Sequence, residues 1–165
     1  MATNLYHGTP EQPYQLAAGA ILVNEEGKIC CHHYYPGSNG TVGDRHAYLL
    51  MRETVESGET LEEAAARGLM EEFGATATAE RFLGSQIAFF ERHGASIQKT
   101  TLYFLYRIQS QDLAQRVDHG DQENTSQVEW LEPDFLIETM KKQPDLFSRS
   151  DVDESEIVER AKNYL

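Results

Sequence analysis

Apolar and polar positions divide the first part of the chain into three expected strands. Leu16–Val23 is apolar throughout, which is typical of a strand buried on both faces. After a polar turn, Lys28–Tyr35 is expected to return beside it as the second strand of a hairpin. A short third strand is expected at Tyr48–Met51, between a glycine-rich loop at residues 36–43 and a second loop at Arg52–Glu59.

The rest of the chain is likewise divided into strands, helices and the loops between them. Two strands are expected at Arg81–Phe90 and Lys99–Ile108, joined by a polar turn at Glu91–Ala95. The remaining elements are a short strand, two helices and an acidic loop, at Gln127–Leu131, Pro133–Lys142, Asp153–Tyr164 and Asp118–Asn124. This order of strands and helices predicts an α+β fold.

The best-marked element is a helix at Leu61–Phe73. Thr60 followed by Glu63 is the pattern of a capping box, and Gly74 stands where a left-handed cap ends a helix. At roughly 100° per residue, one stripe of this helix is apolar and is expected to face the core; it consists of Leu61, Ala65, Leu69 and Phe73.

Two carboxylates of this helix, Glu71 and Glu72, occupy unfavourable positions. Glu72 lies within the apolar stripe, and Glu71 lies on its border. Both are in the last turn, where the helix macrodipole disfavours each negative charge by about 0.3–1 kcal/mol. A hard divalent cation such as Mg²⁺ or Mn²⁺ would compensate them. The alternative is a solvated acidic pair, with Arg67 forming an ordinary ion pair with Glu71 four residues later.

Net charge narrows the range of partners. The chain has 14 Lys and Arg residues against 27 Asp and Glu residues, a formal net charge of −13. This balance argues against coating nucleic acid or binding an anionic membrane, since both need clustered basic residues. A small phosphate-containing substrate remains compatible with it if cations lie between the two negative partners.

The sequence also indicates a location and a domain organisation. No apolar run approaches the roughly 20 residues of a membrane span, and the N-terminal residues lack a secretory-signal pattern. The adjacent Cys30 and Cys31 suit a reducing compartment. We therefore expect a cytoplasmic monomer or homodimer with one domain over residues 1–165, in which residues 1–14 are a candidate flexible segment.

Residues 53–75 resemble the Nudix box, the signature of the Nudix hydrolase family. The box consists of Gly, five residues, Glu, seven residues, Arg-Glu, an aliphatic residue, any residue, Glu-Glu, any residue, Gly and an aliphatic residue. The matching positions in this chain are Glu59, Arg67, Leu69, Glu71, Glu72, Gly74 and Ala75, with Gly58 before Glu59 agreeing as well.

The resemblance implies a Nudix α/β/α sandwich with a mixed sheet, in which the box forms a loop–helix–loop. It implies hydrolysis of a nucleoside diphosphate linked to another moiety, as in a nucleotide, a dinucleoside polyphosphate or a nucleotide sugar, with Mg²⁺ or Mn²⁺ as cofactor. Glu71 and Glu72 correspond to metal ligands, and Glu72 is also a candidate catalytic residue. Glu59 and Arg67 correspond to residues that order the loop and orient the ligand carboxylates.

Two positions depart from the pattern. Glu53 stands in place of the first Gly, and Gly68 stands in place of the Glu that follows the Arg. The site therefore lacks one expected carboxylate, and the general base stays unassigned among Glu53, Glu91 and Glu123. The alternative function is a catalytically weakened Nudix-fold module that binds a nucleotide or has a regulatory role.

Two further groups of residues carry candidate chemistry. Lys99 is a candidate for contacting a substrate phosphate, and Arg52 and Arg45 are candidates with weaker support. The run of residues 30–33, Cys-Cys-His-His, has the residue types of a zinc site. Because alternate residues of a strand face opposite sides, we expect this run to pack in the core or line the substrate cleft instead.

Overall fold

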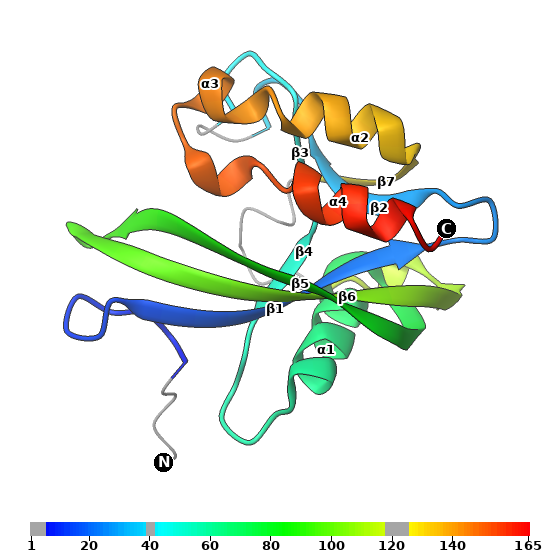
Figure 1. The fold of residues 1–165 in the computed structure, drawn as a ribbon, viewed down its shortest axis with the longest axis horizontal. Helices are drawn as coiled ribbons and strands as arrows, with labels where there is room; N and C mark the ends of the chain where they lie inside the picture. The colour runs from blue at the N-terminus through cyan, green and yellow to red at the C-terminus, as the bar shows by residue number, and fades with distance from the viewer. Residues whose placement is uncertain (1–5, 39–41, 118–125) are drawn as a thin grey trace.

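The computed structural model describes residues 6–38, 42–117 and 126–165. One mixed sheet lies between helices on both of its faces (Figure 1). The strands are β1 (Tyr14–Val23), β2 (Ile29–Tyr34), β3 (Ala47–Leu49), β4 (Met51–Thr54), β5 (Ala75–Arg92), β6 (Ala95–Gln111) and β7 (Gln127–Leu131). The helices are α1 (Leu61–Phe73), α2 (Pro133–Met140), α3 (Gln143–Phe147) and α4 (Ser155–Lys162), with 3₁₀ turns at Leu113–Gln115 and Ser150–Val152.

Strand β1 is the centre of the sheet. The strand order is β3-β2-β1-β6-β5, while β4 also pairs with β1 and β7 also pairs with β2. Strands β1 and β6 run parallel over ten residue pairs, whereas β1 is antiparallel to β2 and to β4. The continuous apolar run predicted as a buried strand is therefore paired along its length and covered on both faces.

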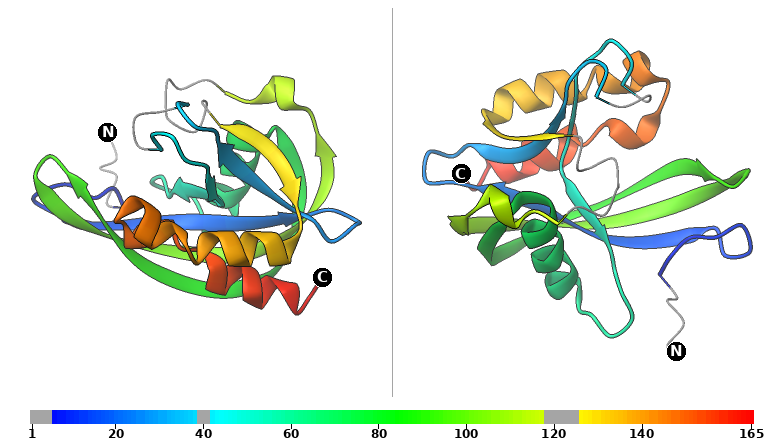
Figure 2. Two further views of the ribbon diagram at one scale, coloured as in Figure 1. Left: turned by 90° about the horizontal axis from the view of Figure 1, so that it is seen from above. Right: turned by 180° about the vertical axis from the view of Figure 1, so that it is seen from behind.

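Alternate residues of β1 face two separate cores (Figure 2). Ile21 and Val23 pack with apolar residues of α2 and α4, including Met140. Ala20 and Leu22 pack on the other face with apolar residues of α1. The two layers of helices confirm the predicted α/β/α sandwich.

Helix α1 begins and ends at the predicted residues. Thr60 and Glu63 form the complete capping box, and Gly74 adopts the left-handed conformation with φ of 61°. All the signals that define this helix lie within its own sequence, which is why they could be interpreted locally.

The predicted strand Tyr48–Met51 is wrong in its extent. Two strands, β3 and β4, cover this region with Leu50 between them, and β4 continues to Thr54 inside the expected loop Arg52–Glu59. The reason is pairing with β1 at a distance in the sequence, from Ala17 opposite Thr54 to Ala20 opposite Met51.

The other differences concern the ends of elements. Strands β5 and β6 have 18 and 17 residues, and a two-residue turn at His93 and Gly94, both with positive φ, connects them. Helices α2 and α4 are shorter than expected, and α3 was not predicted. The acidic loop expected at residues 118–124 lies outside the described residues.

The segment before β1 is hydrogen-bonded from Tyr6 onward. The Tyr6 carbonyl accepts from the Leu16 amide, and the Gly8 carbonyl accepts from Arg92. Among the described residues, no helix is long and apolar enough to span a membrane.

Candidate functional site

Helix α1 and strand β4 lie close together at Gly68. A Cβ atom added at this position would lie 2.5 Å from the Met51 sulfur and 2.9 Å from Cβ of Glu53. A glycine is therefore needed for β4 to lie against the helix at this distance. The close approach positions Glu53 beside the C-terminal half of α1, which carries Glu71 and Glu72.

The guanidinium of Arg67 joins the helix to the loop that precedes it. Its Nε and Nη2 donate to the two carboxylate oxygens of Glu59 at 2.7 and 3.0 Å, and Nη2 also donates to the Thr54 carbonyl at 3.0 Å. These hydrogen bonds from Arg67 hold the pKa of Glu59 below its ordinary value. Arg67 therefore connects α1 to the loop between β4 and α1.

The other guanidinium nitrogen of Arg67, Nη1, faces further carboxylates. It lies 3.4 Å from Oε1 of Glu53 and 3.6 Å from Oε2 of Glu71. The Glu71 contact is the helical ion pair anticipated as the alternative to metal binding. A carboxylate oxygen of Glu56 lies farther from Nη1, at 3.9 Å. The single positive charge of Arg67 thus faces Glu53, Glu56, Glu59 and Glu71.

Glu53 lies in a crowded electrostatic environment. Burial and then the negative charge of Glu72 raise the pKa of the Glu53 carboxyl to about 7, and Arg67 only partly opposes them. The two positions that depart from the box pattern, 53 and 68, are therefore neighbours in space, and one of them carries a crowded carboxylate.

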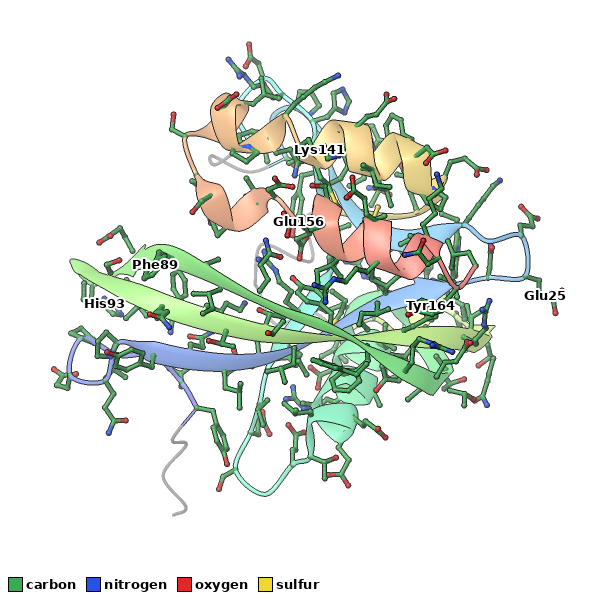
Figure 3. The ribbon with its side chains drawn as sticks, viewed as in Figure 1. Glu25, Phe89, His93, Lys141, Glu156 and Tyr164 are labelled. Carbon is green, nitrogen blue, oxygen red and sulfur yellow. The ribbon has the colours of Figure 1, made fainter. Side chains whose placement is uncertain are left out.

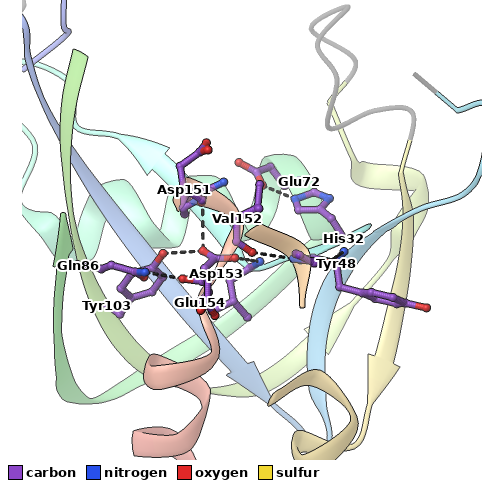
Figure 4. A network of polar contacts seen from close by, with 12 residues as sticks. His32, Tyr48, Glu72, Gln86, Tyr103, Asp151, Val152, Asp153 and Glu154 are labelled. Carbon is purple, nitrogen blue, oxygen red and sulfur yellow. Dashed lines mark hydrogen bonds and ion pairs between the residues drawn. The ribbon is translucent and has the colours of Figure 1, made fainter. Parts of the chain in front are cut away.

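Glu72 is held by a histidine that was not predicted to be its partner. Nε2 of His32 lies 2.6 Å from Oε2 of Glu72 (Figure 4), and Nδ1 lies 2.7 Å from Oγ of Ser126. The two side chains are 2% and 11% exposed. The alternation of residues 30–33 along the strand was the sequence signal that could have placed His32 near α1. His32 shares the α1-facing side of β2 with Cys30.

The next residue of β2 faces the other side of the sheet. Nε2 of His33 lies 2.8 Å from Nδ1 of His46, and its Nδ1 lies 2.9 Å from Glu129. Residues 30–33 therefore do not converge on one point. Within the described part of the chain, no group of three His, Cys, Asp or Glu side chains is already arranged to hold a metal ion.

Arg52 belongs to a buried network on the C-terminal side of the site. It donates to the Asp151 carbonyl at 3.0 Å, and its Nε lies 3.4 Å from Oε1 of Glu154. Glu154 also accepts hydrogen bonds from the Tyr103 hydroxyl at 2.5 Å and from the Leu50 amide at 2.8 Å (Figure 4). The network fixes the backbone next to Glu53.

The remaining predicted site residues lie elsewhere. Lys99 is half-buried on β6, opposite Ala88 of β5 and Gln15 of β1. Glu91 is exposed beside the tip of the β5–β6 hairpin, close to the labelled His93, and the views place this tip away from α1 (Figures 1 to 3). Glu123 lies outside the described residues.

A hollow of about 720 Å³ lies between the C-terminal end of β5 and the segment before α4. Its walls are residues 89–92 and 148–151, so it shares Asp151 with the Arg52 network. Phe89, which is 53% exposed, supplies an aromatic side chain, and Arg149 is held by the carboxylate of Asp151.

The chemistry of the donors fits a hard divalent cation. Glu53, Glu71 and Glu72 offer carboxylate oxygens, which Mg²⁺ and Mn²⁺ prefer over nitrogen or sulfur. In this structure these carboxylates face Arg67 and His32. Binding a cation beside Glu72 would therefore require Glu53 and Glu71 to turn away from Arg67.

A family model described as the NUDIX domain matches residues 13–150 of the chain. A solved structure of a NUDIX hydrolase from Nitrosomonas europaea is similar, with a TM-score of 0.62 at 16% identity over 90% of this chain and 88% of that chain. A MutT protein from Methanosarcina mazei Go1 has a TM-score of 0.56 at 17% identity over 94% and 98%. An Ap4A hydrolase from C. elegans, solved as a binary complex, has a TM-score of 0.56 at 16% identity over 90% and 96%.

At these identities the solved structures show a common fold and no more. None of the curated proteins matches the sequence. The family model, in contrast, covers most of the chain, including the whole of α1 and the loop before it.

Proposed function

The chain belongs to the Nudix family, and on this basis we propose that it is a Mg²⁺- or Mn²⁺-dependent pyrophosphohydrolase. Its substrate would be a nucleoside diphosphate linked to another moiety, cleaved at the diphosphate bridge. The observation that carries this proposal is the pair Glu71 and Glu72 in the last turn of α1, beside the crowded carboxylate of Glu53.

A bound divalent cation supplies charge neutralisation to the phosphate oxygens and lowers the pKa of a coordinated water. Glu71 and Glu72 are the residues proposed to hold it. The hydrogen bond from His32 would fix the orientation of the Glu72 carboxylate, as a neighbouring polar group does for a metal ligand. Arg67 and Glu59 would keep the preceding loop in place against the helix.

The negative charges of the site and of the substrate support the need for a cation between them. A diphosphate group approaching Glu71, Glu72 and Glu53 meets three carboxylates, and Arg67 already divides its charge between Glu53 and Glu71. Without further positive charge, substrate and site would repel each other. The proposal therefore predicts that substrate affinity as well as turnover depends on the metal.

The hollow beside Asp151 is the proposed place for the moiety beyond the diphosphate. An exposed phenylalanine ring offers a stacking surface, and the walls carry the cations Arg92 and Arg149 together with the acids Glu91 and Asp151. Nucleotides, dinucleoside polyphosphates and nucleotide sugars all combine a ring with negative charge. The C. elegans structure described as an Ap4A hydrolase makes dinucleoside polyphosphates one class to include.

An assay of phosphate-containing product over these three substrate classes tests the proposal. Wild-type protein should release product with Mg²⁺ or Mn²⁺ and should not do so with a chelator. Glu72→Gln should abolish release, whereas Glu62→Gln, an exposed acid on the same helix, should leave it unchanged. Metal-independent release, or full activity of Glu72→Gln, would contradict the proposal.

Gly68 gives a specific reason to test a second function. Because α1 offers no carboxylate at this position, the chain could hold a nucleotide-like ligand with little turnover. Thermal stabilisation by one of the panel compounds, combined with no product release under any metal condition, would favour this binding module.

A further inference from the structure

We propose that Glu53 of β4 supplies the third carboxylate of the cation site, in place of the side chain that α1 lacks at Gly68. The inference rests on the proposed function. It assigns the third carboxylate to a strand residue, because the helix alone does not provide one. Its basis is the contact between two elements, β4 and α1, that approach each other at these two residues.

The first step is steric. A side chain at position 68 and the side chain of Glu53 exclude each other, since the two Cβ atoms would be 2.9 Å apart. Neither atom can withdraw easily: the Glu53 backbone is paired with Ala18 of β1, and position 68 is in the middle of a capped helix. The space beside α1 at this level therefore admits one carboxylate, and in this chain it comes from the strand.

The second step concerns where the Glu53 carboxylate points. Its Oε1 and Oε2 of Glu71 lie 3.4 and 3.6 Å from the same nitrogen of Arg67. A positive charge is thus already located between a strand carboxylate and a helix carboxylate. A divalent cation that displaced Nη1 from this point would find oxygen donors on both sides, while Nε and Nη2 of Arg67 keep their bonds to Glu59.

The third step compares the other acids near the loop. Glu56 is farther from Arg67, at 3.9 Å, and its side chain is 63% exposed, whereas that of Glu53 is 22% exposed. Glu91 lies beside the hairpin tip, away from α1. Among the described acids named as candidates for the missing carboxylate, Glu53 alone lies against α1.

Mn²⁺ binding to the purified protein without substrate tests this assignment apart from catalysis. We expect Glu53→Gln to weaken Mn²⁺ affinity at least about tenfold, while Glu62→Gln binds as wild type does. Thermal unfolding of each variant verifies that the fold is retained.

A reciprocal exchange sharpens the test. Gly68→Glu alone should lower the melting temperature, because the new side chain meets Glu53 and Met51. Combining Glu53→Gly with Gly68→Glu removes the Glu53 part of this contact, leaving only the flexible end of the Met51 side chain, and should restore Mn²⁺ affinity above that of the Glu53→Gly single variant.

Three results would overturn the proposal. Wild-type Mn²⁺ affinity in Glu53→Gln, with binding lost in Glu72→Gln, would refute the role of Glu53 and leave the proposed function intact. Weakened binding in Glu91→Gln instead of Glu53→Gln would move the third carboxylate to the hairpin. Absence of Mn²⁺ binding in the wild type would refute the proposed function together with this inference.

Discussion

His32 and Glu72, forty residues apart in the sequence, meet with 2.6 Å between Nε2 and Oε2. The other ring nitrogen of His32 contacts Ser126, so the imidazole is fixed at both nitrogens. Both side chains are almost fully buried between β2 and α1. A carboxylate held in this way has few orientations open to it, which is the condition that a metal ligand requires.

Replacing His32 should therefore affect cation binding more than folding. For His32→Asn we expect Mn²⁺ affinity to fall about 10- to 100-fold, because the shortened side chain no longer reaches Glu72. Titration of Mn²⁺ measures the affinity. His33→Asn, on the opposite face of the same strand, is the control and should bind Mn²⁺ normally. Equal losses in both variants would indicate a general effect on the sheet.

Gly68→Ala has two opposite effects on stability, a gain in helix propensity and a cost in packing. Alanine in the middle of a helix is favoured over glycine by about 1 kcal/mol. The added methyl group, however, would lie 2.9 Å from Cβ of Glu53, and overpacking typically costs about 1–3 kcal/mol. We expect a net loss of about 1 kcal/mol in the free energy of unfolding, measured with urea.

The neighbouring positions provide the controls for this substitution. Met51→Ala should cost less stability in the Gly68→Ala background than in the wild type, since it removes the sulfur 2.5 Å from the new atom. Ala66→Gly, at an exposed position of α1, should lose about 1 kcal/mol through propensity alone. A Gly68→Ala protein more stable than the wild type would mean that β4 moves aside freely.

The ion pair between Glu59 and Arg67 should make stability depend on acid pH. The pKa of Glu59 is lower in the folded protein than its ordinary value of 4.5. Its contribution is therefore fully present above 4.5 and is lost as the pH falls through the lower, folded value. As the pH falls below 4.5, the free energy of unfolding should decrease less in Glu59→Gln than in the wild type. We expect the two decreases to differ by up to about 1 kcal/mol.

Urea unfolding in the presence of chelator, at several pH values between 3 and 6 and roughly constant ionic strength, measures this difference. Glu62→Gln should follow the wild-type curve, because its exposed side chain lies outside the loop contacts. Parallel curves for wild type and Glu59→Gln would show that Arg67 does not favour the charged form of Glu59.

The parts of the fold that the sequence predicted are those with local signals. Helix α1 was located to the residue because its cap residues are all within the helix or next to it. Residues 52–54 of β4 are predicted as a loop because they are polar, and only their pairing with β1 makes them a strand. Bulges in β5 interrupt its alternation, so its length of 18 residues was underestimated.

The candidate site shows the same division. The misplaced acids Glu71 and Glu72 and the two departures at positions 53 and 68 could be identified from the sequence, because each is a conflict with a local pattern. That Glu53 and Gly68 are in contact follows from the packing of a strand on a helix, which no spacing in the sequence specifies. The partner of Glu72 depends likewise on the position of β2 in the sheet.

The buried pair of Glu154 and Arg52 should be important for folding. Glu154 is 1% exposed and accepts hydrogen bonds from Tyr103 and Leu50 besides facing Arg52. Glu154→Gln keeps the size of the side chain but leaves the buried guanidinium without its opposite charge. Removing one member of a buried pair costs about 3–5 kcal/mol, and the Asp151 carbonyl that Arg52 retains should keep the loss near the lower end.

Chemical unfolding of Glu154→Gln and of Glu156→Gln, an exposed residue labelled in Figure 3, tests this expectation. The Glu156 variant should remain within about 0.5 kcal/mol of the wild type. Adding Arg52→Met to Glu154→Gln should recover stability, because the uncompensated charge is then removed as well. If the double variant were less stable than Glu154→Gln, the guanidinium would be stabilising through its bond to Asp151 and not through Glu154.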